Sequence, residues 1–83
     1  MTVTEVRRTV IESMFVCDMI SEPERQRLQS DENADVDLAS LQIDSIKIVD
    51  WCMDLEAKLN REVQIEELVE NDSLNKLSRY LSA

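Results

Sequence analysis

Two short, nearly identical motifs place a serine hydroxyl at the expected start of a helix. They are Asp44-Ser45-Ile46 and Asp72-Ser73-Leu74. A serine in this position can carry a covalently attached group, although Asp followed by Ser is also what helix capping selects. The contexts differ, because Ser45 follows a long polar segment and opens a long helical pattern, whereas only ten residues follow Ser73. Ser45 is therefore the candidate with the stronger context.

A third group of residues has the spacing of calcium ligands. Asp31, Asn33 and Asp35 match positions 1, 3 and 5 of an EF-hand loop. Position 6, which should be Gly for the sharp turn, is Val36, and position 12, which should be a bidentate Glu, is Gln42. The segment is thus interpreted as a solvated acidic loop, and no metal site is predicted.

The composition excludes most enzyme classes. The 83 residues include neither His nor Gly, so a His base, a His metal ligand and a glycine-rich phosphate loop are all ruled out. Cys17 and Cys52 are too few for a zinc site and are interpreted as small core residues. No catalytic residue is predicted, and the chain is not expected to be an enzyme.

The charge balance indicates the kind of partner. Nine Lys and Arg residues against 18 Asp and Glu residues give a net charge of −9, which repels nucleic acids and anionic membranes and favours a basic partner. No apolar stretch approaches the ~20 residues that span a bilayer, and the first residues lack the basic and apolar parts of a signal sequence. A cytoplasmic protein is expected.

Helical periodicity organises the chain before Ser45. Thr2 and Glu5 have capping-box spacing, and apolar residues at three- and four-residue steps predict a helix reaching about Ile20. Ser21-Glu22-Pro23-Glu24 predicts a second, short helical turn through residues 25–28. Residues 30–37 are polar and acidic and are expected to form a long loop, which Leu38, Leu41 and Ile43 anchor at its end.

The second half of the chain predicts three more helical segments. Asp44 is a good N-cap for a helix from Ser45 to about Asn60, residues 66–70 suit a single turn, and Asn71 or Asp72 would cap a last helix. The apolar arc of the 45–60 helix covers more than half of its circumference. The helix is therefore either enclosed on several sides or exposes apolar side chains that a binding partner could contact. The prediction is one all-α domain over residues 1–83, a small four-helix bundle with a long first loop.

At this point the chain resembles the acyl carrier protein family, including the peptidyl carrier domains. The resemblance covers the whole chain, and its most specific part is Leu41-Gln42-Ile43-Asp44-Ser45-Ile46-Lys47-Ile48-Val49-Asp50, followed by Leu55-Glu56 and Leu59. It implies a four-helix carrier fold in which Ser45 holds a 4′-phosphopantetheine arm from coenzyme A, with acyl or aminoacyl cargo as a thioester. It also implies that a phosphopantetheinyl transferase recognises the flanking Asp44.

Three residues depart from the family pattern. Gln42 stands where a Gly is usual, Lys47 where fatty-acid carriers commonly have an acidic residue, and Trp51 is large for a core position. These departures favour a carrier of a dedicated pathway, such as polyketide or nonribosomal peptide assembly, over a housekeeping fatty-acid role. Trp51 is interpreted as core, with a cargo contact as the alternative. A free-standing monomer is expected.

The long helix has more apolar surface than a core requires, which suggests docking. By resemblance this helix faces the partners, namely a loading enzyme and an acyltransferase or synthase with a basic docking surface. The candidate partner-binding residues are Ile46, Asp50, Met53, Asp54 and Glu56. Met53 could instead belong to the core, and the acids could simply be solvated. The alternative function is a small acidic helical adaptor without covalent cargo. This alternative predicts the same helices but gives Ser45 no functional role.

Overall fold

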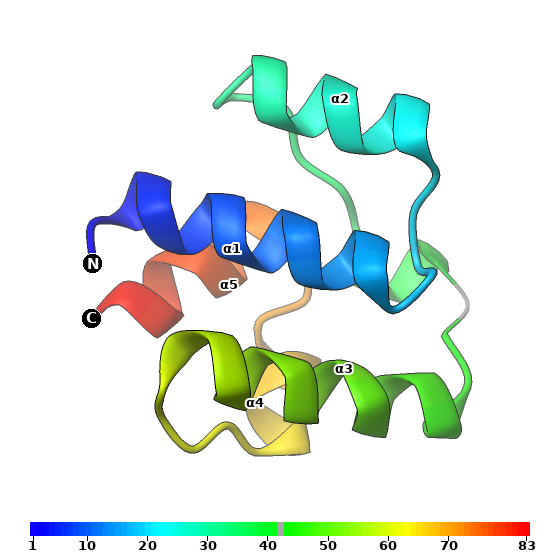
Figure 1. Cartoon of the computed structure of the whole chain (residues 1–83), viewed down its shortest axis with the longest axis vertical. Helices are drawn as coiled ribbons and strands as arrows, with labels where there is room; N and C mark the ends of the chain where they lie inside the picture. Colours follow the sequence, from blue (N-terminus) through cyan, green and yellow to red (C-terminus); the bar gives the residue numbers. More distant parts are fainter. Residues whose placement is uncertain (42) are drawn as a thin grey trace.

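The computed structural model describes residues 1–41 and 43–83, and these fold into a helical bundle (Figure 1). The elements are α1 (Val3–Val16), α2 (Glu22–Ser30), the 3₁₀ helix η1 (Leu38–Leu41), α3 (Ser45–Leu59), α4 (Ile65–Glu70) and α5 (Leu74–Ser82). Within the described residues the only extended pairing is an antiparallel bridge between Asp37 and Ser73. The all-α prediction is confirmed, whereas the two expectations that involve Gln42 lie outside the described residues.

Helix α1 occupies the centre of the bundle and packs against α2, α3 and α5, while α4 packs against α3 (Figure 1). The apolar stripe of α1 predicted from the sequence is buried at Val6, Val10, Ile11 and Met14. Leu28 of α2, Leu55 of α3 and the leucines of α5 complete the core. None of the helices in the described part of the chain is long and apolar enough to cross a membrane.

The first helix ends earlier than the periodicity predicts. The capping box of Thr2 and Glu5 starts it as expected, but α1 ends at Val16 instead of near Ile20. Asp18 adopts a left-handed backbone conformation with φ of 59°, and the amide of Met19 donates to the carbonyl of Met14. Asp tolerates this conformation better than most residues, so the chain leaves the helix there. Ile20 is nevertheless buried, because the turn folds it back onto the core.

Two other boundaries differ from the sequence-based prediction. The expected short turn through residues 25–28 is a full helix, α2 (Glu22–Ser30), which Ser21 caps by accepting from the amide of Glu24. The last helix is capped by Ser73, not by Asn71 or Asp72. The carbonyl of Asp72 accepts from the amide of Leu38 at 2.8 Å, which keeps the chain extended up to Ser73. The helix therefore begins one residue later.

A buried arginine organises the acidic loop after α2. Arg7, only 8% exposed, donates from Nη1 to the carbonyl of Leu28 at 2.7 Å and from Nη2 to the carbonyls of Asp31 at 3.1 Å and Ala34 at 2.6 Å. Its Nε donates to Oδ1 of Asn75 on α5 at 2.7 Å. A guanidinium thus holds the loop to both α1 and α5. The place of Arg7 in the α1 apolar stripe indicates that the side chain is buried, but it does not reveal the distant partners.

This arrangement predicts that calcium will not bind tightly to the loop. Asp31 Oδ1 accepts from the amide of Asn33 at 2.9 Å, and Asp35 Oδ1 accepts from the amides of Val36 and Asn75. These oxygens and the carbonyls facing Arg7 are already hydrogen-bonded, and Val36 stands where an EF-hand needs Gly. Calorimetry should detect no binding tighter than about 1 mM, the weak end of calcium-binding modules. A micromolar affinity would contradict the prediction.

Candidate functional site

The Ser45 hydroxyl is exposed at the first turn of α3 and is not used to build the helix. The cap comes from its neighbour, because Asp44 Oδ1 accepts from the amide of Lys47 at 2.8 Å. Among the described residues the Ser45 side chain makes no hydrogen bond. The amides of Ser45 and Ile46, the first two of the helix, have no intrahelical acceptor. The turn therefore presents a free hydroxyl beside two unpaired N–H donors, where an anion is favoured.

The near-copy of this motif at Ser73 is built differently. Ser73 is itself the N-cap of α5, and its Oγ accepts from the amide of Lys76 at 3.2 Å. The bridge with Asp37 holds its backbone against the loop before η1. The two Asp-Ser motifs thus differ by one residue in where the helix starts. As a result the hydroxyl is engaged at Ser73 and free at Ser45.

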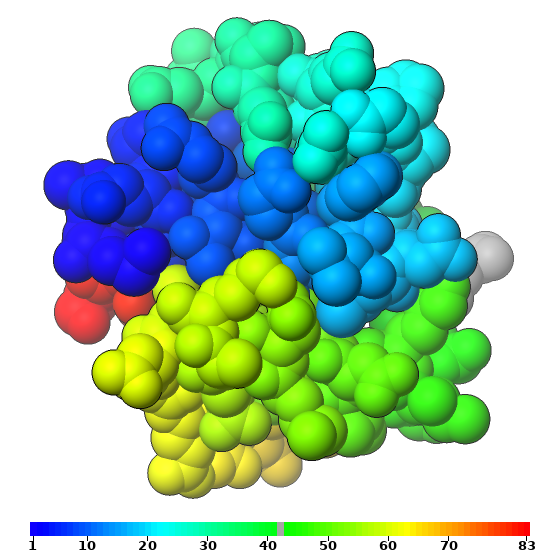
Figure 2. Space-filling model, viewed as in Figure 1, coloured from blue at the N-terminus to red at the C-terminus, as the bar shows by residue number. Residues whose placement is uncertain are grey.

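Lys47 fixes the start of α3 to the end of α1. Its Nζ donates to the carbonyl of Asp18 at 3.0 Å and lies 3.8 Å from the Asp18 carboxylate. Figure 2 shows the end of α1 and the loop after it lying against the first turns of α3. The unusual residue at position 47 therefore has a structural role in positioning the Ser45 turn. Sequence reasoning noted Lys47 only as a departure, because its contact lies 29 residues away in the chain.

The outer face of α3 carries exposed apolar side chains beside carboxylates. Ile46 is 74% exposed, Met53 62% and Val49 42%, and their spacing of three and four residues aligns them along the helix. The alternative that Met53 belongs to the core is therefore wrong. Val49 extends this exposed surface, which we call the α3 apolar strip (Ile46, Val49, Met53).

The predicted acidic residues of α3 are placed unequally around this strip. Asp50 is exposed, whereas Glu56 is half-buried at the opposite edge. Asp54 is also half-buried and pairs with Lys58 at 2.8 Å. Burial opposes ionisation of Asp54, but its two hydrogen bonds with Lys58 prevail and lower the pKa of the carboxyl. Asp50 is thus the most accessible of the three carboxylates.

Trp51 is a core residue, as expected, and also forms a wall of a small cavity. Its side chain is 1% exposed, and its indole Nε1 has no hydrogen-bond partner among the described residues. A cavity of about 240 Å³ lies between η1, α3 and α4. Its walls include Leu38, Ile48, Trp51 and Leu68. Ile43 also lines it, two residues before Ser45. An apolar cavity therefore lies next to the turn that presents the serine.

The chain's own thiols are poor nucleophiles. Cys52 is buried, and its Sγ donates to the carbonyl of Val63 at 2.9 Å. Cys17 is half-buried, so the expectation of a core residue holds fully only for Cys52. Burial raises the pKa of both thiols, and the carboxylates of Asp54 and Asp50 raise that of Cys17 further. Because the thiolate is the reactive form, both thiols are expected to react slowly.

Comparison with known proteins bears on this arrangement. A family model described as the phosphopantetheine attachment site matches residues 16–81, well over half of the chain. The match includes the Ser45 turn, the α3 apolar strip and the cavity beside Trp51. No curated protein and no solved structure matches the chain. The chain therefore belongs to the phosphopantetheine attachment site family, whose members are non-catalytic carriers that hold 4′-phosphopantetheine covalently.

Proposed function

We propose that Ser45 is the attachment residue and that the protein presents acyl or aminoacyl cargo to partner enzymes. The observation that carries the proposal is that the Ser45 hydroxyl is exposed and free, since Asp44 supplies the helix cap. Family membership implies that a serine carries the arm, and the resemblance around Asp44-Ser45-Ile46 favours Ser45 over Ser73. Asp44 is then also the flanking residue that a phosphopantetheinyl transferase would recognise.

The residues around Ser45 suit a phosphodiester. The amides of Ser45 and Ile46 lack intrahelical acceptors, and α3 is 15 residues long, so its N-terminus carries the positive end of a full helix dipole. An exposed anion at such an end gains about 0.3–1 kcal/mol. The thiol of the bound arm would supply the thioester chemistry, and the protein would position it.

Ser45 needs an external base for this modification. The chain contains no His, and no carboxylate hydrogen-bonds the Ser45 hydroxyl among the described residues. An unactivated serine is a weak nucleophile at neutral pH. The transferase must therefore supply the base, after which the flexible arm raises the effective concentration of cargo at whichever enzyme has docked.

The departures from the family pattern support a carrier of a dedicated pathway, such as polyketide or nonribosomal peptide assembly, over one for fatty-acid synthesis. The cavity beside Trp51 would accommodate a short apolar cargo end, since about 240 Å³ is smaller than typical ligand pockets. Such shielding would limit hydrolysis of the thioester between partners.

We expect partners to dock on the α3 apolar strip and on the carboxylates at its edges, Asp50, Asp54 and Glu56. Asp50→Lys should slow cargo transfer through association by about tenfold at low salt, because charge at an interface rim mainly steers the encounter. This decrease in the association rate should be smaller at high salt, because salt screens the charge. Stopped-flow transfer kinetics at several salt concentrations would measure it, with Glu70→Lys as a charge-reversal control on α4.

Met53→Ala tests the apolar part of the same surface. Its exposed side chain contributes nothing to the core, so the variant should keep wild-type helicity and melting behaviour. The free energy of partner binding should become less favourable by about 1–2 kcal/mol. This loss should depend little on salt, because the lost contact is apolar. Unchanged kinetics in both folded variants, at low and high salt, would place the interface on another face.

The function as a whole is tested by intact mass. Wild-type protein incubated with a phosphopantetheinyl transferase, magnesium and coenzyme A should gain the mass of one arm. A protein that gains no mass with several transferases would favour the alternative, an acidic helical adaptor without covalent cargo. The exposed α3 apolar strip would in that case be its docking surface.

A further inference from the structure

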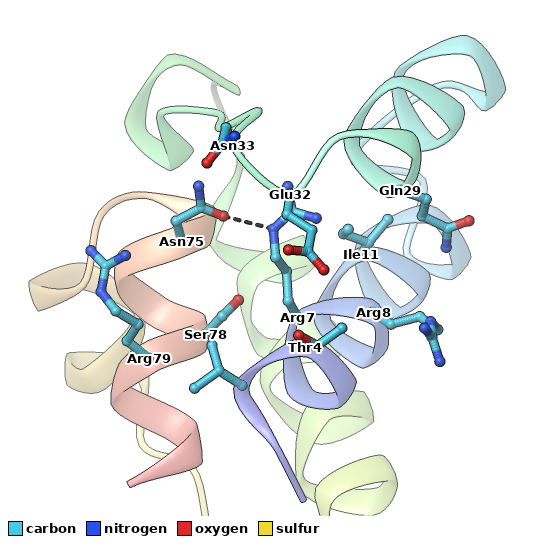
Figure 3. A pocket seen from close by; sticks show the side chains of 11 residues that line it. Thr4, Arg7, Arg8, Ile11, Gln29, Glu32, Asn33, Asn75, Ser78 and Arg79 are labelled. Atoms are coloured by element: carbon cyan, nitrogen blue, oxygen red, sulfur yellow. Dashed lines mark hydrogen bonds between the residues drawn. The ribbon is translucent and has the colours of Figure 1, made fainter.

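Helix α4 is held in the bundle less firmly than the helices around it. Helix α5 packs along α1, and the hydrogen bond from Arg7 to Asn75 joins these two helices (Figure 3). Helix α4 has only six residues, and Leu68 is its single buried side chain. An isolated helix of this length is not stable in water. The contacts that α4 makes with other elements therefore decide whether it stays in place.

The side chains of α4 add little stability of their own. Ile65 and Val69 are exposed, so they contribute little apolar burial. The helix carries three glutamates and no Lys or Arg, and Glu66 and Glu70 are like charges four residues apart. Glu70 also lies in the last turn, where the helix dipole disfavours a carboxylate.

One polar cluster joins α4 to the rest of the bundle. Oε1 of the half-buried Glu67 accepts from the Tyr80 hydroxyl of α5 at 2.7 Å and lies 3.5 Å from Nη2 of Arg61. Its Oε2 accepts from the amide of Gln64 at 2.8 Å. The Gln64 amide most strongly, and then the Tyr80 hydroxyl, lower the pKa of the Glu67 carboxyl, so the accepting carboxylate is the form present at neutral pH. We call the contacts of Glu67 with Arg61 and Tyr80 the Glu67 latch.

Helix α4 forms one wall of the cavity beside Trp51. Leu68 and Val69 of α4 line this cavity together with Leu38 of η1 and Trp51 of α3. Trp51 is nevertheless almost completely buried. Elements with few buried contacts open most readily, so a movement of α4 away from α3 would widen the cavity and expose the indole.

We propose that the Glu67 latch holds α4 against α3 and that its release opens the cavity beside Trp51 to a small apolar group. Tyr80 belongs to α5, which packs on α1, so the latch joins the weakly held helix to a firmly held one. Leu38, Ile48 and Leu68 give the cavity apolar walls, which suit such a group. The latch itself does not depend on the proposed function, and only the use of the cavity by cargo does.

Trp51 is the only tryptophan of the chain, so its fluorescence reports on the opening. Acrylamide, a small neutral quencher, should quench this fluorescence weakly in the full wild-type chain. Tyr80→Phe removes only the hydroxyl of the latch and should raise the quenching constant. The same variant should speed hydrogen exchange of the Asn71 amide, which donates to the Glu67 carbonyl, by about threefold to tenfold, because one hydrogen bond is lost. Exchange of the α1 amides should not change.

Ser82→Ala is the matched control, because it removes a hydroxyl that donates only within α5, to the carbonyl of Arg79. It should leave both measurements unchanged. In a Glu67→Ala background, Tyr80→Phe should have no further effect, because the acceptor is already absent. The proposal would be overturned by wild-type quenching as strong as in the Tyr80 variant or by an equal effect of Ser82→Ala. Equal acceleration of the α1 amides would also overturn it, because the variant would then destabilise the whole fold.

Discussion

Ser45→Ala is expected to gain no mass with transferase, magnesium and coenzyme A, whereas Ser73→Ala should gain one full arm. Both residues follow an Asp and precede an apolar residue, so local sequence alone does not separate them. The structure does, because the Ser73 hydroxyl accepts from the amide of Lys76 and caps α5, whereas the Ser45 hydroxyl is exposed and uncommitted. Intact-mass spectrometry of the two variants beside wild type measures the outcome.

The same pair of variants also separates modification from folding. Ser73→Ala removes a helix cap and should lower the free energy of unfolding by about 1 kcal/mol, whereas Ser45→Ala removes no hydrogen bond formed by the described residues and should leave stability nearly unchanged. The variant that fails to be modified is thus the more stable one. Full modification of Ser45→Ala would refute the proposed attachment residue.

Arg7→Met should lower the free energy of unfolding by about 3 kcal/mol, the largest stability effect that we expect in this chain. The substitution leaves the carbonyls of Leu28, Asp31 and Ala34 without their donor, and it removes the link to Asn75. A domain of this size has only about 4–12 kcal/mol of stability, so the loss is a large fraction of the total. Urea unfolding followed by circular dichroism would measure it.

Arg8→Met is the matched control for this prediction. It removes the same side chain from the next position of α1, where the guanidinium is exposed and makes no hydrogen bond among the described residues, so a change within about 0.5 kcal/mol is expected. Arg7→Lys should recover only part of the loss, because an ammonium lacks the planar fork that reaches several carbonyls. Equal stabilities of the Arg7 and Arg8 variants would show that the loop is held by other contacts.

The local sequence was sufficient for the helix starts that depend on neighbouring residues. The capping box of Thr2 and Glu5 and the cap of Asp44 on Lys47 both join groups three residues apart, so the spacing alone predicted them. The Asp44-Ser45-Ile46 motif belongs to the same class, because its geometry is that of a helix N-terminus. The candidate attachment residue could be named for this reason.

The sequence could not decide which part of the α3 apolar arc is covered. Val49 and Cys52 are both apolar and both belong to the arc, yet Val49 is 42% exposed and Cys52 is buried. The difference arises because α1 and α4 pack on the opposite side of α3, and their positions depend on the whole bundle. Ile46 and Met53 could be assigned to the edge of the arc, but their exposure required the structure.

By itself the sequence determined the helical class, the main caps and the serine motif, because each rests on residues within about one helical turn. The tertiary structure decided that α1 ends at Val16, that Ser73 caps α5, and that Arg7 holds the acidic loop. Arg7 and its partner Asn75 are 68 residues apart in the chain. Contacts of this kind form only when α1, α5 and the loop are packed together, so no local pattern encodes them.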